Sequence, residues 1–123
     1  MIFIYVLAVL VLLDLFYIYN TKTYYLKMIN NIQKKEANVK KSSFVLIYII
    51  LAFVLYFFII KVKKSKEDAF ILGSAIYAIY DLTNYTIFDN WDTTLMLIDI
   101  FWGGILYYST TYIIYRLIEI KKI

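Results

Sequence analysis

Three aspartates, Asp14, Asp81 and Asp99, each stand inside a long apolar run of the sequence. A carboxylate near the centre of a bilayer costs at least about 2.5 kcal/mol on insertion scales, so each of them needs compensation. No lysine or arginine lies inside any of these runs, which excludes the usual buried ion pair. The compensation must therefore come from hydrogen bonds, water, protonation or a bound cation.

The residue types that the chain lacks limit its chemistry further. It contains no histidine and no cysteine. Disulfides, thiolate and imidazole metal sites, haem ligation by these residues and histidine-dependent triads are thus excluded. We expect no cofactor, no metal centre and no enzymatic activity. An acid–base enzyme acting on lipid is the alternative that Asp and Tyr side chains leave open.

The composition is that of a membrane protein. Of 123 residues, 63% are hydrophobic, against roughly 45–50% in an average soluble domain. A net charge of +4 in so apolar a chain is typical of lipid-facing flanks and does not indicate a nucleic-acid surface. We therefore expect the lipid bilayer, and not nucleic acid, as the main partner.

Four apolar runs are each close to the roughly 20 residues that cross a bilayer as an α-helix. They are residues 2–19, 43–60, 69–88 and 93–115. The predicted fold is all-α, an integral membrane four-helix bundle in which residues 1–123 form a single transmembrane domain. The first run has no basic residues before it and contains Asp14, so we interpret it as a span and not as a cleaved signal peptide.

Polar and aromatic residues mark the ends of these runs. Ser65 followed by Asp68 predicts an N-cap for the third helix, and Asp92 or Thr93 predicts one for the fourth. Aromatic rings near the run ends are typical of a belt at the membrane interface. The rings assigned to this belt are Tyr17, Tyr19, Trp91, Tyr112 and Tyr115.

The first loop, residues 20–42, is the only long one. Tyr25, Met28, Ile29 and Ile32 follow one another at helical spacing, with lysines off that stripe. This pattern predicts a short amphipathic helix lying on the membrane, and a solvated linker is the alternative. Basic residues hardly fix the orientation, since seven flank the bundle on the side of the termini and six lie in the first loop. The acidic third loop weakly favours termini inside.

The predicted topology places the three aspartates in one layer. Each is five to seven residues from a helix end on the same membrane face, which corresponds to a depth of roughly 8–10 Å. The third span also carries polar residues at helical spacing on the face of Asp81. The candidate polar pocket comprises Asp14, Tyr77, Asp81, Asn84, Asp99 and Trp102.

Small residues predict close packing of the third and fourth spans. They are Gly73, Ser74, Ala78, Gly103 and Gly104. In addition, the hexapeptide 12–17, Leu-Leu-Asp-Leu-Phe-Tyr, is similar to 97–102, Leu-Ile-Asp-Ile-Phe-Trp, which runs the opposite way through the membrane. Such a relation is typical of inverted transporter repeats, although a chance match within a Leu/Ile/Phe-rich alphabet is the alternative.

Two motifs carry a family resemblance. Tyr-Asp-Leu-Thr-Asn at 80–84, then Trp91 and Leu-Ile-Asp-Ile-Phe-Trp-Gly at 97–103, resemble domain of unknown function 2177, a family of small four-span predicted membrane proteins. The resemblance implies the same layout over nearly the whole chain, and it implies no established activity. Phe16 and Tyr17 stand where the family usually has a tryptophan. Members occur in bacteria and large DNA viruses, and the Ile-, Lys-, Asn- and Tyr-rich composition favours a viral source.

Two functions compete at this point. The first is a structural or assembly component of a cellular or viral membrane, such as the internal membrane of a virion, with a homo-oligomer or other membrane or capsid proteins as partners. The second is a small transporter, channel subunit or ligand-binding membrane protein that uses the aspartates for a proton or cation. Carboxyl groups within about 6 Å of one another favour the second function, and separate placements favour a structural role.

Overall fold

A computed structural model describes residues 1–34 and 40–123, and the described part contains four α-helices and no strand. They are α1 (Ile2–Gln33), α2 (Lys41–Leu55), α3 (Lys66–Ile87) and α4 (Thr93–Glu119). A π-helical turn, η1 (Tyr56–Ile60), continues α2. The predicted all-α four-helix fold is therefore confirmed.

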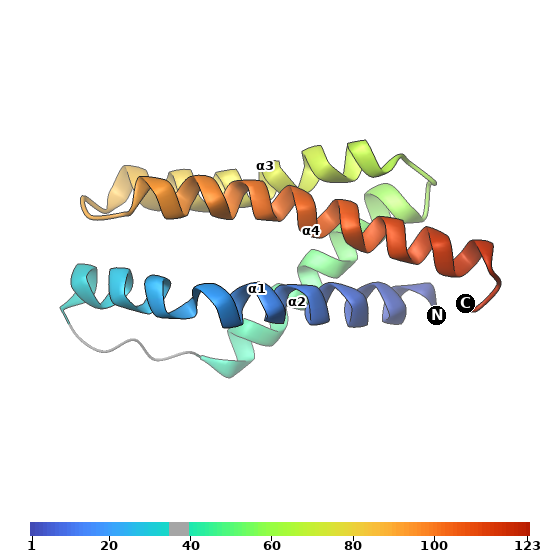
Figure 1. Cartoon of the computed structure of the whole chain (residues 1–123), viewed down its shortest axis with the longest axis horizontal. Helices are drawn as coiled ribbons and strands as arrows, with labels where there is room; N and C mark the ends of the chain where they lie inside the picture. The colour runs from blue at the N-terminus through green and yellow to red at the C-terminus, as the bar shows by residue number, and fades with distance from the viewer. Residues whose placement is uncertain (35–39) are drawn as a thin grey trace.

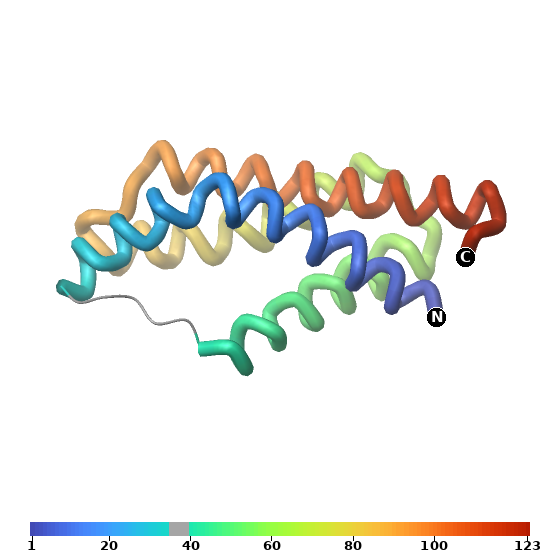
Figure 2. The backbone as a smooth tube through the Cα atoms, turned by 60° about the horizontal axis from the view of Figure 1, so that its bottom comes forward, coloured from blue at the N-terminus to red at the C-terminus, as the bar shows by residue number. Residues whose placement is uncertain are grey.

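The helices are arranged as a long bundle with both termini at one end (Figure 1). Helices α3 and α4 form an antiparallel hairpin, and α1 runs beside α4 in the opposite direction (Figure 2). Helix α2 crosses obliquely and lies beside the N-terminal part of α1 only. The far parts of α1, α3 and α4 consequently extend beyond α2 and meet around the turn at residues 88–92.

Three helices of the described chain are long and apolar enough to cross a membrane: Ile2–Gln33, Lys41–Ile60 and Thr93–Glu119. Helix α3 has 22 residues, or roughly 33 Å, but charges in its first turn and the polar face around Asp81 make it less apolar. It lies along α4, so the two helices occupy the same depth (Figure 1).

Both predicted N-caps form. The Ser65 hydroxyl accepts a hydrogen bond from the backbone N–H of Asp68 at 3.0 Å. The Asp92 carboxylate accepts one from the N–H of Leu95 at 2.9 Å. These bonds satisfy backbone donors that the first turns of α3 and α4 leave free, and they define where each helix begins.

The predicted amphipathic helix is present, but it is not a separate element on the membrane surface. Residues 20–33 continue α1 without a break, because the chain contains no proline and no glycine there to end the helix. Met28, at the centre of the stripe, is buried against Trp91 and Leu95. The stripe therefore packs on the turn 88–92 and the start of α4, and residues 35–39 of the predicted segment lie outside the described residues.

Glycines bring α3 and α4 into backbone contact, as the small-residue pattern predicts. A Cβ atom on Gly73 would overlap the carbonyl of Gly103, and one on Gly103 would overlap the ring of Tyr77. Gly104 faces the Ser74 hydroxyl and the ring of Phe70 in the same way. Ala78 is half-buried one turn further along α3. Only glycine permits this approach, which places Asp81 and Asp99 on neighbouring surfaces.

Candidate functional site

Asp14 is held by two donors from two other helices. Its Oδ2 accepts a hydrogen bond from the Tyr48 hydroxyl of α2 at 2.6 Å, and its Oδ1 accepts one from the Trp102 indole of α4 at 2.8 Å. The side chain is 6% exposed. Each carboxylate oxygen thus has a donor, which is the arrangement that stabilises an ionised carboxylate away from water.

A second hydrogen bond joins α1 and α4, with the donor on α1 and the acceptor, Asp99, on α4. The Oδ1 of Asp99 accepts a hydrogen bond from the Tyr17 hydroxyl of α1 at 3.0 Å. The Tyr17 and Trp102 rings stack with centroids 4.7 Å apart and planes 5° from parallel. The two rings therefore fill the space between the two aspartates while each bonds the aspartate of the opposite helix.

This reciprocal pairing involves the two hexapeptides that match in sequence. Each aspartate accepts a hydrogen bond from the ring that stands three residues after the other aspartate. Because α1 and α4 are antiparallel, the four side chains of Asp14, Tyr17, Asp99 and Trp102 are related by a local two-fold arrangement. We call these four residues the reciprocal clamp. Whether it arose by internal duplication stays a prediction.

Asp81, fully buried on α3, is bonded differently. Its Oδ1 accepts long hydrogen bonds, both 3.4 Å, from the Tyr25 hydroxyl and the Trp91 indole. Its Oδ2 is buried and has no hydrogen-bond partner in the described part of the chain. The carboxyl group of Asp99 lies close enough to that of Asp81 for their charges to interact. We call Asp81 and Asp99 the carboxyl pair.

Two ionised carboxylates have only acceptors and cannot bond one another. A proton or a cation between them converts the contact of the carboxyl pair into an attraction. Asp14 lies close enough for the charge of Asp99 to act on it. Within the described residues the single salt bridge joins Arg116 to Glu119, at the far end of α4, so no basic side chain neutralises the aspartates.

The layer of aspartates predicted from helix depth is consistent with these contacts, but the other pocket residues have different roles. The Tyr77 ring packs over Gly103, and its hydroxyl makes no hydrogen bond to any of the three aspartates. Asn84 is half-buried on α3, one turn after Tyr80. Among the residues where the structure is described, no three acidic side chains are grouped as metal ligands.

Four aromatic donors were not predicted as part of the site: Tyr17, Tyr25, Tyr48 and Trp91. Tyr17 and Trp91 were assigned to an interfacial belt because they stand near the ends of apolar runs. Tyr25 lies on the amphipathic stripe, which indicates the direction of its side chain but does not identify Asp81 as its partner. Tyr48 stands in an apolar run without any local signal that points to Asp14.

Comparison with known families agrees with the layout of the chain. The family described as "Predicted membrane protein (DUF2177)" matches residues 1–116. The chain therefore belongs to this family, which covers all four helices up to the last turn of α4. No curated protein and no solved structure matches the chain.

Proposed function

We propose that this membrane protein binds and releases a proton at the carboxyl pair, and that it acts as a small transporter or channel subunit. The observation that carries the proposal is the nearness of the Asp81 and Asp99 carboxyl groups, with no basic partner in the described part of the chain. Asp81 has a buried oxygen without a hydrogen-bond partner among the described residues, whereas both oxygens of Asp14 are bonded. A site with an unsatisfied oxygen can take up and lose a proton without breaking the fold.

A route for the proton leads through Tyr25. Its hydroxyl donates a hydrogen bond to Asp81 at 3.4 Å and lies near Asp99, and a hydroxyl can accept one proton while donating another. The indole of Trp91 donates only, so it holds Asp81 in place without carrying protons. The Tyr25 and Trp91 rings, whose centroids are 6.3 Å apart, meet edge to face, and both side chains donate to Asp81.

Reconstitution in liposomes tests this function. With a pH-sensitive dye inside and a potassium-driven membrane potential, the wild-type protein should acidify or alkalinise the lumen faster than empty liposomes do. Asp81→Asn and Asp99→Asn should abolish the proton flux. Asp89→Asn, a matched change at an exposed acid of the turn, should retain it. No flux above empty liposomes, or equal flux in all variants, contradicts the proposal.

The reciprocal clamp favours a second function, a structural or assembly component of a membrane. Its hydrogen bonds fix α1 against α4, and large apolar side chains of α1 such as Leu12, Phe16 and Tyr19 are left exposed to lipid or to another copy of the chain. Crosslinking in intact membranes tests this function, and isolated monomers count against it. The other expectations from the sequence stay predictions. They are a homo-oligomer, capsid or other membrane partners, a virion membrane, a viral source and the lack of enzymatic activity.

A further inference from the structure

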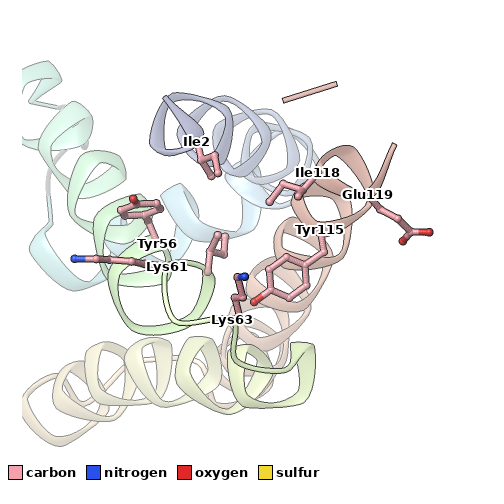
Figure 3. Close-up of a pocket in the computed structure, with 8 residues that line it drawn as sticks. Ile2, Tyr56, Lys61, Lys63, Tyr115, Ile118 and Glu119 are labelled. Atoms are coloured by element: carbon pink, nitrogen blue, oxygen red, sulfur yellow. The ribbon is translucent and has the colours of Figure 1, made fainter. Parts of the chain in front are cut away.

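A second feature lies at the opposite end of the bundle. The turn 61–65 follows η1 there, and both termini lie beside it (Figure 1). A pocket of about 500 Å³ opens there between the start of α1, η1 and the last turns of α4 (Figure 3). Its lining combines apolar side chains with the two lysines Lys61 and Lys63. No residue of the reciprocal clamp or the carboxyl pair lines it.

Lys63 gives the pocket a positive charge. The Lys61 ammonium points away from it, over the Phe57 ring at 4.9 Å from the centroid. Figure 3 shows the Lys63 ammonium directed toward the pocket beside Tyr115, whereas the Glu119 carboxylate points away from it. Glu119 is paired with Arg116 at 3.0 Å, so its charge is already offset. The apolar part of the lining comes from Ile2, Ile60 and Ile118.

The backbone of this turn is unusual and is held from two sides. The π-helical turn η1 is a rare element that is frequent at functional sites. Lys63 has a φ of 59°, a left-handed conformation that is uncommon for a residue other than glycine. The Tyr115 hydroxyl donates a hydrogen bond to the Lys64 carbonyl at 2.6 Å. The turn is therefore fastened to α4 in the conformation that presents Lys63.

We propose that this pocket binds an anionic phospholipid, with the phosphate near Lys63 and part of one acyl chain against Ile2, Ile60 and Ile118. The end of a membrane-spanning bundle lies at the depth of lipid headgroups, and basic pockets between such helices are suited to anionic headgroups. Pairing of Glu119 with Arg116 removes the negative charge that would repel the phosphate. This proposal is independent of proton binding at the other end of the bundle.

Native mass spectrometry of the detergent-purified protein tests the site with two lipids of the same acyl chains, phosphatidylglycerol and phosphatidylcholine. The wild-type protein should retain phosphatidylglycerol in preference. Lys61→Gln with Lys63→Gln should weaken its binding about fivefold, because the Lys63 ammonium faces the pocket. The matched double variant Lys22→Gln with Lys27→Gln, which removes two exposed lysines of α1 far from the pocket, should bind as the wild type does.

A third variant separates the pocket from simple surface charge. Ile118→Trp keeps every lysine but fills the apolar part of the lining, and it should weaken phosphatidylglycerol binding as well. Excess inorganic phosphate should not compete, because a free phosphate lacks the acyl chain. Equal binding of the two lipids, equal losses in both lysine double variants, or displacement by phosphate overturns the proposal. Circular dichroism checks that each variant remains helical.

Discussion

Asp14 and Asp81 are both buried aspartates, yet the protein accommodates them in different ways. Asp14 has a close donor for each oxygen, at 2.6 and 2.8 Å. Asp81 has two long bonds to one oxygen, both 3.4 Å, and the carboxyl group of Asp99 beside it. Full satisfaction makes Asp14 a fixed structural group, because any change of its protonation breaks a bond. Incomplete satisfaction leaves the carboxyl pair free to exchange a proton.

The largest effect on stability is expected from a substitution that separates α3 from α4. Gly73→Val should lower the free energy of unfolding by about 3 kcal/mol, because its Cβ meets the backbone carbonyl of Gly103, which cannot give way. Asp81 would then move away from Asp99, whereas Asp14 stays bonded to α2 and α4. Unfolding titrations in mixed detergent measure the loss. Ala75→Val, at an exposed position of α3, is the control and should change stability little.

Asparagine substitutions compare the two aspartates directly. At Asp14 the amide offers one acceptor to two donors, so Asp14→Asn should cost about 1–2 kcal/mol of unfolding free energy. At Asp81 the amide nitrogen can donate to Asp99 while the oxygen still accepts from Tyr25 and Trp91. Asp81→Asn should therefore change stability by less than about 0.5 kcal/mol. The same unfolding titrations measure both changes. Equal losses of unfolding free energy at the two positions would show that the two aspartates do not differ.

Removal of single tyrosine donors gives a further comparison of the two aspartates. Tyr48→Phe removes the 2.6 Å bond to Asp14 and should cost about 1 kcal/mol. Tyr25→Phe removes a 3.4 Å bond and should cost less than half of that amount. In the liposome assay the order reverses, because Tyr25→Phe should slow proton flux while Tyr48→Phe leaves it intact. A Tyr25→Phe variant with normal flux would exclude Tyr25 from the route.

The sequence allowed the helices and their caps to be predicted, because both depend on local composition and spacing. The partners of the aspartates depend on how helices rotate against one another, which no local pattern encodes. Tyr48 donates to Asp14 across 34 positions of the chain, and nothing near Tyr48 distinguishes it from a lipid-facing tyrosine. The matching hexapeptides did contain the reciprocal clamp, but only the antiparallel contact of α1 and α4 shows which ring bonds which aspartate.

The same limit explains the error at residues 20–33. The pattern predicts an amphipathic helix from its lysines and from the stripe at Tyr25, Met28 and Ile32. It does not distinguish an apolar face that meets lipid headgroups from one that packs against protein. The length of α3 and α4 decides between the two, because their ends reach far enough to place Trp91 against Met28. The lack of proline and glycine lets α1 run for 32 residues, and tertiary contact determines what its apolar face meets.

Infrared spectroscopy of the detergent-purified protein tests the central claim most directly, since the C=O stretch of a protonated carboxyl group is separate from that of a carboxylate. We expect the wild-type protein at neutral pH to show a carboxylic-acid band that Asp81→Asn and Asp99→Asn each remove. Asp14→Asn and the exposed control Asp89→Asn should both retain the band. A wild-type spectrum without it, or a band that only Asp14→Asn removes, would contradict the assignment of a shared proton to the carboxyl pair.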